Sequence, residues 1–267
     1  MNKVAFITGA SRGIGRETAL AFARAGFDVA ISARTLEEGE THAHALTHAD
    51  GRPLAGSLAA TAEAVRALGG EACTVRMDLL DERSVRDAAA AVLERFGRID
   101  VLVNNAIYQG ADLNAPFLAL DVDGLQRVFQ GYVVAPVVLT QCLLPAMLAQ
   151  GGGTIINVTS GAGESDPPVA AGKGGWGYAY GAGKAVALEV RRPGVPFIKI
   201  VRDGDAWQLV QPFAGRASAP AVDAALAALR SARVEHYVVS GVTNGAEAAT
   251  ADARARLVFY GLDADSA

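Results

Sequence analysis

Short hydrophobic runs alternate with longer amphipathic stretches through most of the chain. The runs carry too few polar positions for strands with one face in water, so they predict strands that are buried on both faces. The predicted strands are residues 4–8, 28–32, 72–77, 99–104 and 153–159, and the predicted helices are residues 13–25, 57–69, 81–96 and 121–150. This alternation predicts an α/β fold with a doubly wound parallel sheet, in which helices cover both faces.

Two segments interrupt the alternation. Residues 37–56 are polar and rich in turn-forming residues, which predicts a surface loop before the helix at 57–69. Near the other end, prolines should stop a helix near Arg191, and the runs "FIKIV" and "AWQLV" on either side of the Asp-Gly pair at 203–204 predict a β-hairpin. The chain shows no internal repeat and no linker, so residues 1–267 are expected to form a single domain.

Composition narrows the range of partners. The chain has 267 residues, of which 51% are hydrophobic, a formal net charge of −4 and no run of basic residues. Binding to nucleic acid or to an anionic membrane is therefore not expected. The N-terminus lacks the hydrophobic run of a signal peptide, and the apolar run at 133–139 is too short to span a bilayer. Cys73 and Cys142 fall in apolar segments, which predicts buried thiols in a reducing compartment and favours the cytoplasm.

Three glycines, Gly9, Gly13 and Gly15, lie between the first predicted strand and the first predicted helix. At this position backbone amides and the helix N-terminus can hold a pyrophosphate, and side chains would block its approach. Turns from strand to helix often contain one or two glycines for structural reasons alone, so the glycines by themselves are a weak signal. Their context strengthens the prediction of a dinucleotide site.

The stretch "TGASRGIG" resembles the glycine loop of the short-chain dehydrogenase/reductase family, and "MDLLD" and "NNA" further along continue the similarity. The resemblance implies a Rossmann-type fold and an oxidoreductase with a nicotinamide coenzyme. In that family Asp78 would lie by the adenine ring, while Asn104 and Asn105 would close the coenzyme cleft. The residues that the resemblance assigns to the coenzyme are Gly9, Ser11, Arg12, Gly13, Ile14, Gly15, Arg34, Asp78, Leu79, Asn105, Ala106, Tyr180 and Lys184.

The end of the second predicted strand indicates which coenzyme binds. An acidic residue there usually binds the ribose 2′-hydroxyl of NAD, whereas a basic residue accommodates the 2′-phosphate of NADP. The sequence has Ala33 at the acidic position, followed by Arg34, and Arg12 in the glycine loop can approach the same phosphate. NADP(H) is therefore the predicted coenzyme. The alternative is that both arginines are ordinary surface residues, which leaves the missing carboxylate unexplained.

A serine, a tyrosine and a lysine complete the resemblance. The stretch "INVTSGAG" supplies Ser160 and "YGAGK" supplies Tyr180 and Lys184, at the positions that the family uses for catalysis. Residues four apart share one face of a helix, so the ammonium can lie near the phenol and favour the phenolate. By the resemblance, the tyrosine exchanges a proton with the substrate oxygen, the serine hydrogen-bonds that oxygen, and the lysine also holds the nicotinamide ribose. The predicted reaction is hydride transfer between NADP(H) and a small carbonyl or alcohol substrate.

Three departures from the family pattern leave alternatives open. Tyr132 stands where many members have an asparagine that supports a water chain to the lysine; its hydroxyl can relay protons, or its ring can fill the space of the water. Phe213 replaces the glycine of a Pro-Gly pair and could crowd the nicotinamide. The loop at 161–177, part of the expected substrate region with 185–220, is either a flap or a passive excursion.

These departures motivate a second hypothesis, a catalytically weak NADP(H)-binding relative that acts as a sensor or partner protein. A relative that catalyses epimerisation or dehydration is disfavoured, because such members usually have a longer C-terminal substrate domain. The resemblance also implies a homo-oligomer, a dimer or a tetramer. His42, His44 and His48 lie close together, but no cysteine or carboxylate cluster joins them, so a solvated polar loop is favoured over zinc and no metal is predicted.

Overall fold

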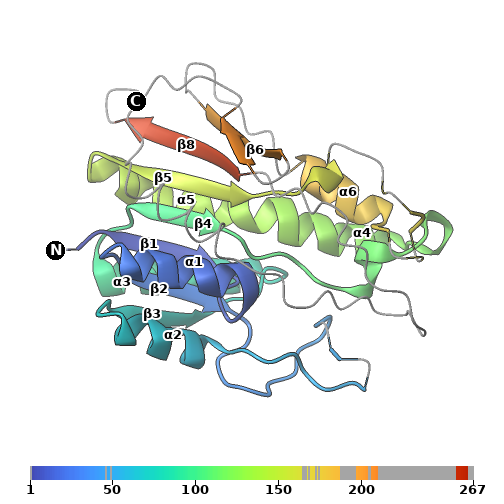
Figure 1. The fold of residues 1–267 in the computed structure, drawn as a ribbon, viewed down its shortest axis with the longest axis horizontal. Helices are drawn as coiled ribbons and strands as arrows, with labels where there is room; N and C mark the ends of the chain where they lie inside the picture. Colours follow the sequence, from blue (N-terminus) through green and yellow to red (C-terminus); the bar gives the residue numbers. More distant parts are fainter. Residues whose placement is uncertain are drawn as a thin grey trace.

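The computed structural model describes residues 2–186 except 46, 49, 164–166, 168, 172 and 174, together with 197–203, 206–209 and 257–263. In these residues, helices lie on both faces of one sheet (Figure 1). The parallel strands lie in the order β3-β2-β1-β4-β5 and are β1 (Val4–Thr8), β2 (Asp28–Ala33), β3 (Ala72–Arg76), β4 (Val101–Asn104) and β5 (Gly152–Val158). This order confirms the doubly wound, Rossmann-type fold, and each predicted strand is present.

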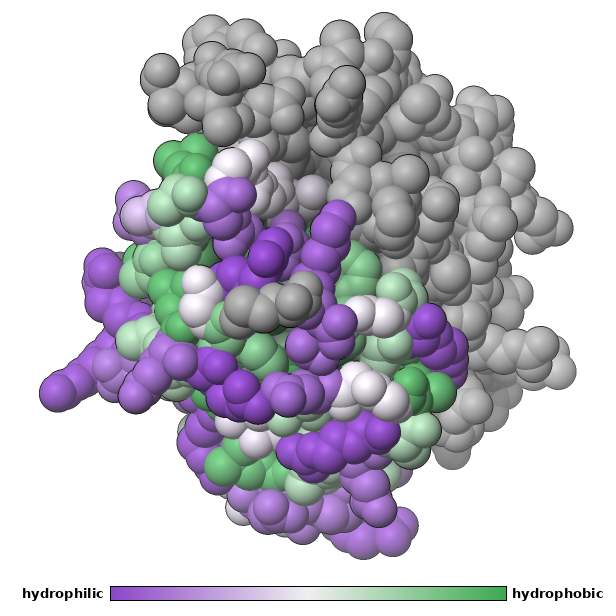
Figure 2. All heavy atoms as spheres, turned by 90° about the vertical axis from the view of Figure 1, so that its left-hand side faces the viewer, coloured by the Kyte–Doolittle hydropathy of each residue, from purple (hydrophilic) through white to green (hydrophobic). Residues whose placement is uncertain are grey.

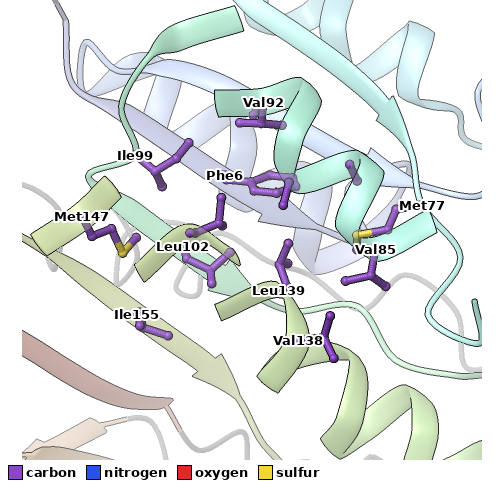
Figure 3. Packing of buried hydrophobic residues seen from close by; sticks show 14 of the residues in the cluster. Phe6, Met77, Val85, Val92, Ile99, Leu102, Val138, Leu139, Met147 and Ile155 are labelled. Carbon is purple, nitrogen blue, oxygen red and sulfur yellow. The ribbon is translucent and has the colours of Figure 1, made fainter. Parts of the chain in front are cut away.

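The two faces of the sheet bury separate cores. On β1, Ala5 and Ile7 contribute to one core and Phe6 to the other, because successive side chains of a strand point to opposite faces. In the second core, Phe6 and Leu102 of the sheet pack with Leu139 of the long helix (Figure 3). The first core is covered by α1 (Gly13–Arg24) and α2 (Leu58–Ala67), and the second by α3 (Glu82–Phe96) and α5 (Ala135–Ala149).

Local sequence sets where the helices begin and end. The side chains of Ser57 and Asp81 accept hydrogen bonds from the backbone N–H groups of Ala60 and Arg83, in the first turns of α2 and α3. These N–H groups have no partner within their own helix. α3 ends at Gly97, whose φ of +70° lies in the left-handed region that favours glycine. α1, α2 and α3 lie within the ranges that the sequence predicts for them.

The predicted helix at 121–150 is present but not uniform. It consists of α4 (Val122–Phe129) and α5, joined by a π-helical turn, η3 (Gln130–Val134), which the sequence did not predict. By length and composition alone, the whole helical stretch is apolar enough to cross a membrane. However, Leu139 and Leu143 are at most 1% exposed and lie in the second core, against the sheet. The part of the helix that carries these residues therefore packs as a core helix does, and 33% of the apolar window is buried.

Three further strands extend the sheet beyond β5. β8 (Leu257–Asp263) pairs antiparallel with β5, and β6 (Phe197–Asp203) pairs antiparallel with both β8 and β7 (Ala206–Leu209). The pairing of β6 with β7 confirms the predicted hairpin. The predicted helix end near Arg191 and the position of Phe213 lie outside the described residues.

Both cysteines are free thiols, as predicted, and both pack against the second core, but they are partly and not fully buried. Cys73 lies on β3, the outermost strand of the parallel sheet, where one side of the strand has no neighbour. Partial burial still raises the pKa of its thiol. Sγ of Cys142 lies 3.7 Å from Nη1 of Arg86 on α3, near the edge of the second core.

The five parallel strands all point toward the edge of the sheet where α6 (Tyr178–Val186) lies (Figure 1). Figure 2 shows the molecule from the opposite end, where hydrophilic and hydrophobic residues are interspersed over the described part of the surface. Ligands of doubly wound sheets bind at the carboxyl ends of the strands. The predicted site residues lie in the segments that follow β1, β2, β3, β4 and β5, at this carboxyl edge.

Candidate active site

The turn after β1 brings Gly9 and Gly15 against the segment that follows β4. Gly9 has a φ of +69°, and a Cβ on it would lie 2.8 Å from Cα of Ala106. A Cβ on Gly15 would lie 2.3 Å from the carbonyl oxygen of Gly9 and 2.6 Å from Nδ2 of Asn105. These separations are too short for a Cβ atom, so the packing of the protein itself requires glycine at positions 9 and 15.

Asn105 and Thr8 hold the two segments together. Nδ2 of Asn105 donates hydrogen bonds to the carbonyl oxygens of Thr8 at 2.8 Å and of Gly9 at 3.3 Å. Oγ1 of Thr8 accepts from the backbone N–H groups of Asn105 at 3.0 Å and Ala106 at 2.9 Å. Thr8 is 2% exposed and donates to the carbonyl oxygen of Val103. The structure thus joins the predicted residues Gly9, Asn105 and Ala106 through a threonine that sequence analysis had not singled out.

The N-terminus of α1 lies beside open space. The helix begins after Arg12, whose side chain makes no capping hydrogen bond. Gly13 has a φ of +55°, and a Cβ on it would have no atom of another segment within 4 Å. The first N–H groups of a helix lack partners within the helix and attract anions. This turn, which also carries Ser11 and Ile14, therefore fits a phosphate group.

Arg12 reaches from this turn to the end of the loop at 37–56. Its Nη2 donates to the carbonyl oxygen of Gly56 at 2.8 Å and lies 3.4 Å from Oγ1 of Thr35. Its Nε is buried and has no hydrogen-bond partner among the described residues. Burial lowers the pKa of the Arg12 guanidinium, and the nearby carboxylate of Glu38 opposes that shift. The Nε of Arg12 is therefore a buried hydrogen-bond donor without a partner in the described part of the chain.

Arg34 and Arg76 are neighbours at the ends of β2 and β3. Nη1 of Arg76 donates to the carbonyl oxygen of Arg34 at 2.5 Å, and its guanidinium pairs with both carboxylate oxygens of Glu40 at 2.9 and 3.0 Å. Nη1 of Arg34 donates to the carbonyl oxygen of Ala43 at 2.5 Å. The hydrogen bonds from Arg76 lower the pKa of the Glu40 carboxyl to about 2. The sequence analysis did not single out Arg76. Its position two residues before Asp78, at the end of a predicted strand, was the signal that could have placed it at this edge of the sheet.

Asp78 and Leu79 follow β3 and are anchored to neighbouring helices. The backbone N–H of Asp78 donates to Oγ of Ser84 at 3.0 Å, and Oδ1 of Asp78 accepts from the backbone N–H of Leu80 at 3.0 Å. Nε2 of Gln130 lies 3.5 Å from the carbonyl oxygen of Leu79. The two residues therefore lie in a hydrogen-bonded turn at the carboxyl edge of the sheet.

Tyr180 and Lys184 lie together on α6, close to the end of β5. Lys184 is 4% exposed, and its Nζ donates to the carbonyl oxygen of Val158 at 3.2 Å. The same Nζ lies 6.0 Å from the ring centre of Tyr180 and 4.9 Å from the ring centre of Tyr132. Burial lowers the pKa of Lys184 to about 8. The predicted pair is thus brought together around a buried ammonium.

Ser160 follows β5 and precedes the short turn η4 (Gly161–Gly163). Its Oγ accepts from the backbone N–H of Ala162 at 3.2 Å. The turn packs against α6, because a Cβ on Gly181 would lie 3.1 Å from the carbonyl oxygen of Ala162. The segments that carry Ser160 and Tyr180 are therefore in contact, although the loop between them is long.

Tyr132 projects from the π turn η3 toward the same lysine. It is 4% exposed, and its hydroxyl is buried without a hydrogen-bond partner among the described residues. Burial, and to a smaller extent Tyr180, raise the pKa of this phenol. A Cβ on Gly183 of α6 would lie 2.8 Å from Cγ1 of Val128 and 3.4 Å from the ring of Tyr132, so α6 packs closely against this region. The ring occupies the space beside Lys184.

A second buried tyrosine, Tyr108, follows β4 and belongs to a polar network. Its hydroxyl lies 2.6 Å from Oδ2 of Asp112, and Nε of Arg127 donates to the same hydroxyl at 3.2 Å. The ring of His44 lies 5.7 Å from the ring of Tyr108. The loop at 37–56 is largely exposed, as predicted, and its His44 contacts the segment after β4.

The model of the short chain dehydrogenase family matches residues 3–57 and 53–192. The chain belongs to the short-chain dehydrogenase family. An uncharacterised oxidoreductase from Mycobacterium tuberculosis is 36% identical over 160 residues, which are 60% of this chain and 52% of that protein. The chain therefore matches only about half the length of this curated relative.

Solved structures of short-chain dehydrogenases show the same fold. A metagenomic short-chain oxidoreductase in complex with NADP is 33% identical, with a TM-score of 0.55 over 69% of this chain and 71% of the other. Carveol dehydrogenase from Mycobacterium avium, in complex with NAD, is 25% identical, with a TM-score of 0.57 over 69% of this chain and 61% of the other. Similar short-chain dehydrogenases thus bind either coenzyme, so the choice between them depends on the residues of this chain.

Proposed function

We propose that this short-chain dehydrogenase is an NADP(H)-dependent oxidoreductase that acts on a small carbonyl or alcohol substrate. The observation that carries the proposal is the pairing of Tyr180 with the buried ammonium of Lys184. The pair lies at the same edge of the sheet as the glycine turn, so a dinucleotide held at that turn would extend toward α6. When bound, the coenzyme would supply or accept the hydride.

The residues at this edge fit a dinucleotide. The glycine turn and the N-terminus of α1 would hold the pyrophosphate through backbone amides, because Gly13 leaves the backbone accessible, while Gly9 and Gly15 let the turn pack against the segment after β4. The turn at Asp78 would border the adenine. The remaining residues proposed to contact the coenzyme are Ser11, Arg12, Ile14, Arg34, Leu79, Asn105, Ala106, Tyr180 and Lys184.

The preference for NADP(H) rests on two arginines. Arg12 has a buried Nε without a partner among the described residues, which suits an additional anionic acceptor. Arg34 follows Ala33, so no carboxylate stands at the end of β2 to bind a ribose 2′-hydroxyl. Arg76 adds a third positive charge beside Arg34, although Glu40 neutralises it in this structure.

In the proposed mechanism, Tyr180 exchanges a proton with the substrate oxygen and Ser160 donates a hydrogen bond to that oxygen. Lys184 supports this role because its pKa of about 8 leaves the ammonium charged at neutral pH. A positive charge beside the phenol favours the phenolate, so the tyrosine can act nearer neutrality than a free phenol. Lys184 would also donate to the ribose hydroxyls of the coenzyme.

The test is a panel of aldehydes, ketones and alcohols, followed through the absorbance of NADPH. Tyr180→Phe preserves the ring and removes the exchangeable proton, so it should lower turnover by about two orders of magnitude while NADPH affinity changes little. Normal turnover of Tyr180→Phe would exclude Tyr180 as the acid. A wild-type protein that binds NADPH and turns over nothing in the panel would favour the second candidate, a coenzyme-binding sensor, which the substitution of Tyr132 for the usual asparagine motivates.

We further propose that the protein is a cytoplasmic homo-oligomer. The support is its family and the surface of the long helix, where Val134 and Val137 are 38% and 37% exposed. Light scattering on the purified chain tests the oligomeric state, and a monomer at micromolar concentration would exclude it.

A further inference from the structure

We propose that Tyr132 is a positioning residue that holds the ammonium of Lys184 with its aromatic ring, and that its hydroxyl takes no part. The importance of this contact for catalysis rests on the function proposed above, in which Lys184 supports Tyr180 and binds the coenzyme. The contact itself does not depend on that function. It follows from the surroundings of three side chains at the end of α6.

The ammonium of Lys184 has few polar neighbours. Its side chain is 4% exposed, and the hydrogen bond to the carbonyl oxygen of Val158 uses one of its three N–H donors. The ring centre of Tyr132 lies 4.9 Å from Nζ, within the distance at which the negative face of an aromatic ring attracts a cation. The ring centre of Tyr180 is more distant, at 6.0 Å. Tyr132 is therefore the nearer of the two aromatic partners.

The hydroxyl of Tyr132 does not explain why a tyrosine stands here. It is buried and has no hydrogen-bond partner in the described part of the chain. An unpaired buried hydroxyl destabilises a protein, whereas a buried ring beside a cation is favourable. The ring also meets Tyr180 edge to face, with ring centres 5.9 Å apart and an angle of 86°. The favourable contacts all belong to the ring.

The backbone around Tyr132 is adapted to this placement. The residue lies in the π turn η3, and single π turns within α-helices occur frequently at functional sites. On α6, Gly183 allows close approach to α4, because a Cβ there would lie 2.8 Å from Cγ1 of Val128 and at ordinary contact distance, 3.4 Å, from the ring of Tyr132. The π turn and this close packing of α6 together place the ring beside Lys184.

No charged side chain competes for Lys184 among the described residues that pack around it. Asp112 on η1 (Ala111–Asn114) and Arg127 on α4 pair with each other at 3.2 Å, and Tyr108 hydrogen-bonds to both. Asp123 of α4 is exposed. Burial is accordingly the cause that lowers the pKa of Lys184. The ring of Tyr132 is the nearer aromatic neighbour of the ammonium.

The experiment follows the titration of Lys184 in the protein without coenzyme. The chain has four lysines, Lys3, Lys173, Lys184 and Lys199, so lysine labelled with carbon-13 gives few signals, and Lys184→Met assigns the relevant one. The variants are Tyr132→Phe and progressively fluorinated phenylalanines at the same position. Fluorination weakens the negative face of the ring at nearly constant size, so these variants should fold alike.

Tyr132→Phe should keep the titration midpoint of Lys184 near that of the wild-type protein, because the ring remains. Full fluorination should lower the midpoint by about one pH unit, with intermediate rings in order. The same substitutions at Tyr108, which is equally buried at 4% exposure, should leave the midpoint unchanged. A midpoint that does not respond to fluorination at Tyr132, or that moves with Tyr132→Phe as much as with the fluorinated rings, would overturn the proposal.

A second measurement separates this inference from the proposed function. Fluorescence titrations measure the affinity for NADPH at a series of pH values. The pH above which this affinity is lost should become lower as the ring at position 132 carries more fluorine. If the midpoint of Lys184 moves but NADPH affinity does not follow it, the contact with Tyr132 stands and the coenzyme role of Lys184 fails. A Tyr132→Asn variant with higher turnover than wild type would instead show that a polar relay serves the lysine better than the ring, and would refute a positioning role.

Discussion

Replacing Lys184 with methionine should change how the free energy of unfolding depends on pH. Lysine has an ordinary pKa of 10.5, and burial lowers that of Lys184 to about 8 in the folded protein. Each pKa unit corresponds to about 1.4 kcal/mol, so keeping this ammonium charged in the folded state costs up to about 3 kcal/mol. Methionine is a similarly long, uncharged side chain and removes that cost.

The sign of the effect follows from which state binds the proton. Below pH 8 both states are protonated, so the folded protein carries the full cost of the buried charge. Between pH 8 and 10.5 the folded state releases its proton while the unfolded state retains it, so the stability of the wild-type protein rises with pH. The advantage of Lys184→Met should therefore be greatest at pH 7 and decline to almost nothing near pH 10.5.

Urea denaturation at a series of pH values, without coenzyme, measures this difference. Lys173→Met is the matched control, because Lys173 is exposed and its variant should run parallel to the wild type at every pH. Ionisation at high pH of the tyrosines that do not contact Lys184 affects all three proteins alike and cancels in the comparison. Parallel curves for the wild type and Lys184→Met would refute the reasoning, since they would mean that Lys184 titrates equally in both states.

Three further predictions concern other parts of the site. Arg34→Asp should reduce NADPH affinity about tenfold or more and raise NADH affinity, because a charge-assisted contact is worth roughly 1.5–3 kcal/mol. Equal affinities of the wild-type protein for NADPH and NADH, measured by calorimetry, would contradict the assignment of NADP(H) as the coenzyme. Tyr132→Phe should raise the free energy of unfolding by about 1 kcal/mol, because it removes an unpaired buried hydroxyl, and a measured loss in urea would show that the hydroxyl has a partner. Gly15→Ala should lower the free energy of unfolding by about 2 kcal/mol or more, because its Cβ would lie 2.3 Å from the carbonyl oxygen of Gly9. Gly13→Ala meets no such contact and should lower it less. Thermal unfolding of the two variants and the wild type measures the difference.

The alternation of buried strands and amphipathic helices was sufficient to predict the fold. The four inner parallel strands bury side chains on both faces, as the sequence predicts, whereas the outermost strand, β3, buries none of its side chains fully. The pairing of Tyr180 with Lys184 was also predictable, because a spacing of four on one helix determines which side chains share a face.

Contacts between distant segments could not be predicted in the same way. Arg76 pairs with Glu40 across 36 positions of sequence, and this depends on how the loop after β2 folds back. The π turn at Tyr132 adds a single residue to a long apolar helix, and hydrophobic periodicity there is too weak to show such an insertion. The partial exposure of Cys73 follows from the outer position of β3, which the order of strands along the chain does not reveal.

The composition of α6 has a consequence for the order in which the protein folds. Its nine residues include Gly181 and Gly183, and each glycine in a helix costs roughly 1 kcal/mol relative to alanine. A helix this short is unstable alone, so it must form as it docks against η4 and α4, where these glycines allow close approach. The sheet and its two cores need no such assistance. Partly unfolded molecules would therefore keep the glycine turn and lose the tyrosine–lysine pair first.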